Sequence, residues 1–505
     1  MSRGRPTPFK GPVKAPIKVV GKSLWLLALV ALLGACAPRE RLLPALGLEV
    51  PRVDELPQDF EAPLSAQTGQ PMDGFGGGGG GVERTPVIFV HGNTVSAGFW
   101  KPTREHFEDA GYSEDELWAF SWGWNNARYL DSADLSVASV QRMVDAVQGY
   151  LREQRGVAAP QVDIIGHSLG VTLVRQWMKQ ANAWHRVRRF IGVAGANDGV
   201  WTAWADTRGQ QRPVAWELYP GSPWLAQLNR GNEVPGGTRY MTLYDGSGWG
   251  DVLFPYPLED SSALEGADNL AWNREHGDWY GHLNLPWEEG PAQAMIAWLR
   301  EGQEAPATDP ADAPDVALED GAEGPRLHAD QEGAQIYCRD DGSDPGLANT
   351  EPRAALPMQP GRLYSCFAHD PQTGLASPLH RHKAWQGEPA QGQRPTLTIE
   401  PAGGAFEQPQ RVRLRSDDPE AFIVYNTAGL PLSTGSPLYD PEQPIFVAAP
   451  LRLTAMAVSP GGQTSEPVTV DFDISLELVE ATRTLQRQFD PSRPLRYAGE
   501  RKQGN

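Results

Sequence analysis

Cysteine, long apolar runs and basic charge are all scarce in this 505-residue chain. Its three cysteines, Cys36, Cys338 and Cys366, form no paired Cys-x-x-Cys, and no His-Glu-x-x-His occurs, so no zinc-site signature is present. The chain has 44 Lys and Arg against 63 Asp and Glu, which gives a net charge of −19. A protein with this charge repels nucleic acid and anionic lipid headgroups. We expect a monomer with no metal, no other cofactor and no nucleic-acid partner.

An apolar run near the N-terminus bears on localisation. Six basic residues precede the run of residues 24–33, which is too short to span a bilayer as a mature helix. The following Leu33-Gly34-Ala35-Cys36 resembles a bacterial lipobox, which implies removal of residues 1–35 and lipidation of Cys36. Ala37 in place of Asp implies the outer membrane by the same resemblance. The alternatives are a plain signal peptide, with secretion, or a short membrane anchor.

Composition divides the rest of the chain into regions. Residues 36–84 are rich in Pro, Gly and acidic groups and end in six consecutive glycines, which predicts a flexible tether. Residues 303–325 are acidic and rich in Ala and Pro, which predicts a linker. The intervening residues 85–302 suffice for one domain with its own core.

Residues 85–302 alternate short apolar strands with amphipathic helices. The predicted strands cover 86–90, 117–120, 162–165, 190–194 and 240–244, and the predicted helices 99–110, 136–154, 171–178 and 291–300. This alternation indicates a mostly parallel, doubly wound α/β sheet covered by helices.

The motif Gly166-His167-Ser168-Leu169-Gly170 lies between a predicted strand and a predicted helix. A strand, a Gly-x-Ser-x-Gly turn and a helix together form a nucleophile elbow. The glycines permit a strained turn, and the N-terminus of the helix favours developing negative charge. We therefore predict that Ser168 is a nucleophile, which needs a neighbouring imidazole, a carboxylate and two N–H donors to act.

Four segments resemble, in this order, the class 2 bacterial lipases and their polyester-depolymerase relatives, which are α/β-hydrolases. They are residues 86–93, the elbow at 166–170, residues 193–197 and residues 280–285. The resemblance implies that His282 is the general base and that the backbone N–H groups of Asn93 and Leu169 form the oxyanion hole. The long segments 199–237 and 259–278 depart from the family, so the substrate does not follow from it.

The long segment 199–237 is rich in tryptophan. It contains Trp201, Trp204, Trp216 and Trp224. Aromatic side chains on a loop near an active site line a pocket for acyl chains or pack the loop itself, and both readings stay open.

The other histidines near these motifs are weaker candidates for the base. His276 is the alternative to His282, but it lies among charged residues that indicate a solvated loop. His91 and His167 adjoin the two turns, which favours supporting roles for both.

Three aspartates are candidates for the acid. Asp198 lies in a predicted turn, and Asp245 directly follows a strand but precedes Gly246, which is typical of a tight turn. Asp251 precedes a short apolar run, as the acid does in the family. We predict Asp251, with Asp245 as the alternative and Asp198 third.

Beyond residue 325 the chain changes to β character and repeats itself. Residues 334–345 and 421–431 are related by a shift of 87. The two copies, 326–388 and 395–473, resemble the small sandwich domain at the C-terminus of chitobiases, which implies two all-β Ig-like domains that act as a spacer or as a weak platform for a ligand or partner. Cys338 and Cys366 both fall in the first copy and predict a disulfide in an exported protein. For residues 474–505 we expect a C-terminal helix or tail.

The sequence thus predicts a lipid-anchored serine hydrolase that cleaves carboxylic esters through an acyl-enzyme, as a lipase or carboxylesterase. Its substrate would be an ester or a lipid, with polymers included. One alternative is a depolymerase of extracellular polyester. An alternative of another class is a surface-binding lipoprotein that has lost catalysis.

Overall fold

The computed structural model describes residues 53–93, 95–123, 133–158, 161–200, 214, 217–246, 251, 261–272, 281–301, 312–321, 324–385 and 394–474. The predicted signal peptide, Cys36, three of the four insertion tryptophans, His276 and the C-terminal segment 475–505 lie outside the described residues.

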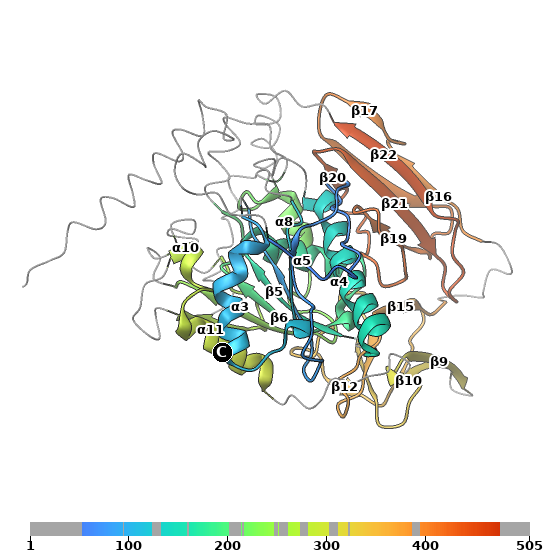
Figure 1. The fold of residues 1–505 in the computed structure, drawn as a ribbon. Helices are drawn as coiled ribbons and strands as arrows, with labels where there is room; N and C mark the ends of the chain where they lie inside the picture. The colour runs from blue at the N-terminus through green and yellow to red at the C-terminus, as the bar shows by residue number, and fades with distance from the viewer. Residues whose placement is uncertain are drawn as a thin grey trace, which may run out of the picture. The chain divides into compact units, whose positions relative to one another are not determined.

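Residues 53–301 contain an eight-stranded sheet, of which Figure 1 labels β5 and β6. The strand order of this sheet is β1-β2-β4-β3-β5-β6-β7-β8. Its strands are β1 (Asp54–Glu55), β2 (Gly74–Phe75), β3 (Val87–Val90), β4 (Leu117–Phe120), β5 (Val162–His167), β6 (Val187–Val193), β7 (Arg239–Tyr244) and β8 (Asp268–Ala271). All neighbouring strands run parallel except β2 and β4. The predicted doubly wound, mostly parallel sheet is confirmed.

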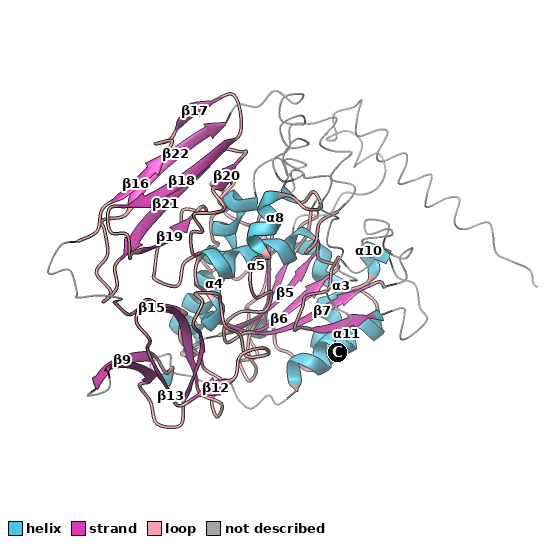
Figure 2. Ribbon diagram, turned by 180° about the vertical axis from the view of Figure 1, so that it is seen from behind, coloured by secondary structure: helices cyan, strands magenta, loops and turns pink. Residues whose placement is uncertain are grey.

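Helices cover both faces of this sheet. They are α3 (Lys101–Asp109), α4 (Ala133–Arg155), α5 (Leu169–Gln180), α8 (Pro223–Leu228), α10 (Gly281–Asn284) and α11 (Glu289–Arg300). Helix α4 packs against α5 on one face, and α11 packs against α3 on the other (Figures 1 and 2). Strands β3, β4 and β5 are buried along their whole length, as expected for a parallel sheet covered on both sides. None of the helices in the described residues is both long and apolar enough to cross a membrane.

The flexible tether predicted for residues 36–84 is wrong for residues 53–84. Strands β1 and β2 extend the sheet, and Met72 and Phe75 are buried in its core. All six glycines of Gly76–Gly81 have positive φ, and a Cβ on Gly76 would lie 2.6 Å from the Trp118 side chain. Glycine is needed here because the backbone has positive φ and lies close to the Trp118 side chain. The six glycines therefore form a fixed part of the fold and do not indicate a flexible linker.

The C-terminal half contains two pairs of small sheets (Figure 2). The first repeat has sheets β13-β10-β9 and β12-β11-β14-β15, and the second has sheets β16-β18-β20 and β17-β22-β21-β19. Their strands are β9 (Val316–Gly321), β10 (Gly324–Ala329), β11 (Gln335–Arg339), β12 (Pro352–Arg353), β13 (Ala355–Pro357), β14 (Leu363–His369), β15 (His380–Lys383), β16 (Leu397–Glu400), β17 (Gly404–Phe406), β18 (Gln410–Ser416), β19 (Phe422–Asn426), β20 (Ile445–Val447), β21 (Leu451–Val458) and β22 (Val468–Ile474). All pairs are antiparallel except β17 and β22, and the predicted all-β class of this half is confirmed.

Two details of the first repeat bear on the sequence analysis. Strand β9 lies inside the linker predicted for 303–325, which is wrong there because residues 316–321 pair along their length with β10. Cys338 and Cys366 face each other across β11 and β14 and form a disulfide, with their Cα atoms 4.2 Å apart. Tyr425 and Ala455 form the corresponding cross-strand pair between β19 and β21 of the second repeat.

Candidate active site

Ser168 lies at a sharp turn between β5 and α5. Its backbone has φ 53° and ψ −122°, a conformation that residues with a side chain rarely adopt and that costs of order 1–3 kcal/mol. The Ser168 N–H donates to the carbonyl of Val193 at 2.9 Å, which ties the turn to the neighbouring strand β6. The elbow therefore presents the serine hydroxyl at the carboxyl end of the sheet.

The two glycines of the motif provide space, while the positive φ falls on the serine. A Cβ on Gly170 would lie 2.3 Å from the carbonyl oxygen of Val90, and one on Gly166 would lie 3.0 Å from the backbone of Val171. Helix α5 can thus pack closely on β3 at Gly170 and on β5 at Gly166, because neither position carries a side chain.

His282 joins the serine to a buried carboxylate. Its Nε2 lies 3.0 Å from Ser168 Oγ, and its Nδ1 lies 2.7 Å from Asp251 Oδ2. The Asp251 side chain is 2% exposed and the His282 side chain 11%. The structure therefore brings together the three residues predicted from the sequence, which lie in the turn before α5, in α10 and in the region after β7.

The alternative acids occupy other places in the sheet. Asp245 is buried directly after β7, and the backbone N–H of Asp198 donates to the carbonyl of Ser261 at 3.2 Å in the turn after β6. The hydrogen bond at His282 Nδ1 goes to Asp251.

His167 supports the backbone of His282. Its Nε2 lies 2.9 Å from the carbonyl oxygen of His282, so this nitrogen carries the hydrogen and donates. Burial lowers the pKa of His167 well below its ordinary value, aided by the adjacent His282, so the ring is neutral. Its ring stacks on Phe99 at 4.5 Å, and Phe99 in turn contacts Trp287 at 5.1 Å. Phe99 and Trp287 were not among the predicted site residues, because their signal in the sequence is only an aromatic side chain at or near the start of a predicted helix.

The loop after β3 passes beside Ser168. A Cβ on Gly92 would lie 2.8 Å from Ser168 Cβ, which places the backbone that continues to Asn93 next to the elbow. Leu169 is the first residue of α5, where backbone N–H groups point out of the helix. Both N–H groups predicted for an oxyanion hole thus belong to backbone segments that meet at Ser168.

His91 is a structural residue of this loop. Its ring stacks on Trp122 at 5.1 Å, and Trp122 Nε1 donates to the His91 carbonyl at 3.0 Å. Burial lowers the pKa of His91 to about 4, so its ring is neutral at ordinary pH. In the part of the chain that the structure describes, no group of three or more His, Cys, Asp or Glu side chains is arranged to hold a metal ion.

A mostly parallel sheet with a Gly-x-Ser-x-Gly elbow defines an α/β-hydrolase. Residues 84–245 match the family of class 2 lipases, and residues 401–469 match the chitobiase/beta-hexosaminidase C-terminal domain. Both families are those recognised from the sequence, and the first match supports a carboxylic ester hydrolase of the lipase type. It covers Asn93, Ser168 and Leu169 and ends before Asp251 and His282.

Several solved structures resemble this chain at low identity. Lipase B of Aspergillus fumigatus is 14% identical over 53% of this chain and 68% of its own, with a TM-score of 0.38. The mature form of lipase BlEst2 of Bacillus licheniformis is 18% identical over 43% of this chain and 92% of its own, with a TM-score of 0.32. No curated protein sequence matches the chain.

Proposed function

We propose that this protein is a serine hydrolase that cleaves carboxylic esters of the lipase or carboxylesterase type through an acyl-enzyme. The observation that carries the proposal is the continuous contact from Ser168 Oγ to His282 Nε2, and from His282 Nδ1 to buried Asp251. With Nδ1–H donating to the carboxylate, Nε2 has a lone pair that accepts from the serine hydroxyl.

This arrangement supports an ordered reaction. Ser168 Oγ attacks the ester carbonyl while His282 Nε2 takes the hydroxyl proton, and Asp251 stabilises the imidazolium. The oxyanion that forms accepts hydrogen bonds from the backbone N–H groups of Asn93 and Leu169. His282 then gives its proton to the departing alcohol, and a water molecule activated by the same imidazole hydrolyses the acyl-enzyme. No step needs a cofactor.

Replacement of the nucleophile tests the proposal. Ser168→Ala removes the attacking oxygen, so we expect hydrolysis of p-nitrophenyl esters to fall by at least about 10³-fold and fluorophosphonate labelling to disappear. Circular dichroism checks that the fold is kept, and Ser113→Ala in the turn before β4 is the control, with labelling unchanged. Labelling of Ser168→Ala at another serine would contradict the assignment.

We further propose that the protein is anchored in the cell envelope through lipidated Cys36. The support is the lipobox-like sequence Leu33-Gly34-Ala35-Cys36 after a basic and apolar leader. Stable anchoring requires more than one acyl chain, which a modified N-terminal cysteine provides. In Cys36→Ser we expect loss of metabolic fatty-acid labelling and release from the high-salt membrane fraction, and retention there would contradict the proposal.

A further inference from the structure

Both β-repeats bind the C-terminal end of α5, the helix that begins at the nucleophile. The helix ends at Gln180, and Asn182 follows with a left-handed φ of 51°. The backbone N–H of Leu379 in the first repeat donates to Asn182 Oδ1 at 3.0 Å, and Asn182 Nδ2 donates to the Leu379 carbonyl at 2.8 Å. Asn182 Nδ2 also lies 3.2 Å from Ser433 Oγ of the second repeat.

Gln180 makes the matching contacts with the second repeat. Asn426 Nδ2 donates to the Gln180 carbonyl at 2.8 Å, and the backbone N–H of Thr427 donates to Gln180 Oε1 at 2.9 Å. Gln180 and Asn182 are 2% and 3% exposed, so these amides are removed from water and their hydrogen bonds depend on the repeats.

Apolar packing continues across the same contact. Leu379 and Leu430 of the repeats, which are 1% and 9% exposed, belong to the core cluster of the hydrolase. The backbones also approach closely, because a Cβ on Gly435 would lie 2.0 Å from the Leu379 carbonyl oxygen and 2.2 Å from Asn182 Nδ2. Hydrolase, first repeat and second repeat therefore meet at one point.

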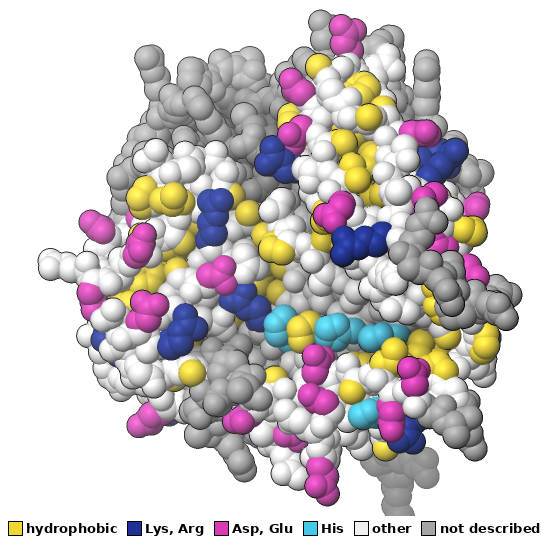
Figure 3. Space-filling view, turned by 90° about the vertical axis from the view of Figure 1, so that its right-hand side faces the viewer, with side chains coloured by type: hydrophobic (Ala, Val, Ile, Leu, Met, Phe, Trp, Pro, Cys, Tyr) yellow, Lys and Arg dark blue, Asp and Glu magenta, His cyan; other side chains and the backbone are white. Residues whose placement is uncertain are grey.

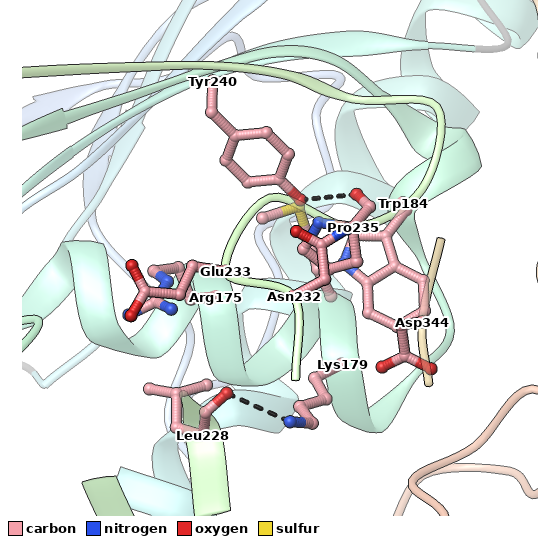
Figure 4. Close-up of a pocket in the computed structure, with 10 residues that line it drawn as sticks. Arg175, Lys179, Trp184, Leu228, Asn232, Glu233, Pro235, Tyr240 and Asp344 are labelled. Carbon is pink, nitrogen blue, oxygen red and sulfur yellow. Dashed lines mark hydrogen bonds between the residues drawn. The ribbon is translucent and has the colours of Figure 1, made fainter. Parts of the chain in front are cut away.

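The segment around α8 is held between the same parts. Lys179 Nζ on α5 donates to the carbonyls of Gln227 and Leu228 at 2.8 and 3.0 Å, while Gln227 Nε2 also donates to the hydroxyl of Tyr425 in the second repeat. Figure 4 shows Lys179 and Asp344 of the first repeat lining one small pocket, and burial lowers the pKa of this lysine to about 8.

The segment of the first repeat between β11 and β12 also contacts the hydrolase. The backbone N–H of Gly236, between α8 and β7, donates to the Pro345 carbonyl at 2.8 Å. Arg381 is buried between the repeats, where it pairs with Asp344 and donates to the carbonyl of Ser436 at 2.6 Å.

We propose that the two β-repeats are an intramolecular docking partner of the hydrolase, which holds the end of α5 and the α8 segment in place, so that the two halves unfold as one unit. Contacts between domains of one chain are commonly polar and permit relative motion. In this protein, by contrast, separation of the repeats from the hydrolase would expose the apolar side chains of Leu379 and Leu430. It would also break the hydrogen bonds of the buried Asn182 and Gln180 amides with the repeats. The repeats thus have a function that a spacer does not have.

The test cuts the chain and keeps both halves present. A protease recognition sequence is inserted in the segment 302–311, and the full-length protein is cleaved and passed through a native size-exclusion column at low micromolar concentration. We expect the two halves to elute together and to melt in a single transition with the temperature of the uncut chain. Separate elution with an unchanged melting temperature of the hydrolase half would overturn the proposal.

Two variants locate the contact, with one matched control. Gly435→Ala and Asn182→Ala are expected to weaken association of the cut halves by at least about tenfold and to speed amide exchange at Leu379 and Thr427. Gly149→Ala on α4, where a Cβ would meet no atom within 4 Å, should leave both unchanged. Unchanged association in Asn182→Ala, together with unchanged exchange, would also overturn the proposal. These readouts do not depend on ester hydrolysis, so they stand apart from the proposed reaction.

Discussion

The position of Ser168 at a turn between a strand and a helix could be predicted from sequence because its signal is local, whereas the choice among the candidate acids could not be settled in the same way. The elbow motif and the elements beside it span a few residues, and they determine both the turn and the position of the hydroxyl. Asp251 and Asp245 are six residues apart and equally acidic, and only the three-dimensional course of the chain distinguishes them. In the structure the distance of 2.7 Å to His282 Nδ1 favours Asp251.

A pair of isosteric changes tests the acid. Asp251→Asn removes the negative charge that holds Nδ1–H and stabilises the imidazolium, so we expect kcat to fall by about 10⁴-fold with KM nearly unchanged. Asp245→Asn is the matched control and should keep kcat within about tenfold of the parent. Steady-state kinetics on a soluble p-nitrophenyl ester measure both. If kcat falls by this amount in Asp245→Asn and stays near the parent value in Asp251→Asn, the acid is Asp245.

At the scale of elements, the central strands follow from apolar runs and the edge strands do not. The predicted strand 240–244 corresponds to β7 (Arg239–Tyr244), and the predicted strand 162–165 to β5 (Val162–His167). Strand β8 has the sequence Asp-Asn-Leu-Ala, whose first two positions are polar and exposed, so it has no apolar run to detect. Strands β1 and β2 have two residues each and form only where the rest of the sheet provides a partner.

The disulfide between β11 and β14 gives a prediction at this scale. It closes a loop with a sequence separation of 28, which should stabilise the chain by about 3–4 kcal/mol on the loop-entropy model. We expect the double change Cys338→Ala with Cys366→Ala to lower the free energy of unfolding by that amount, measured by urea denaturation.

Thiol alkylation provides an independent check of the bridge. In the unfolded, unreduced protein, mass spectrometry should find neither Cys338 nor Cys366 modified, and both should react after reduction. Free alkylation of both cysteines without a reductant would show that the bridge does not form in the mature protein.

For the whole molecule, buried histidine side chains with lowered pKa values make the free energy of unfolding depend on pH. Figure 3 shows histidine side chains in a row on one face, with acidic side chains spread around them. On β15 the rings of His380 and His382 lie 6.3 Å apart, and Asp315 lies 3.0 Å from His380 Nε2. Burial lowers the pKa of His382 to about 4, aided by His380, and the pKa values of His91 and His185 to about 4 as well.

These depressed values predict loss of stability in mild acid. Between pH 6.5 and 4 the unfolded chain binds protons at these histidines while the folded chain does not, so the free energy of unfolding falls as pH falls, by up to about 1.4 kcal/mol per pH unit for each group. Burial raises the pKa of Asp163 to about 6, which works in the opposite direction and offsets about one histidine. The net effect of the three histidines and Asp163 is a loss of stability.

Urea denaturation at pH 7, 6 and 5 measures this dependence. We expect the free energy of unfolding to fall by about 2–4 kcal/mol from pH 7 to pH 5, since two of the three histidine contributions remain after the offset. His382→Gln removes one titrating group and keeps a polar side chain, so the fall should shrink by about 1–2 kcal/mol in this variant. A chain that is equally stable at pH 5 and pH 7 would show that the buried histidines do not stay neutral in the folded state.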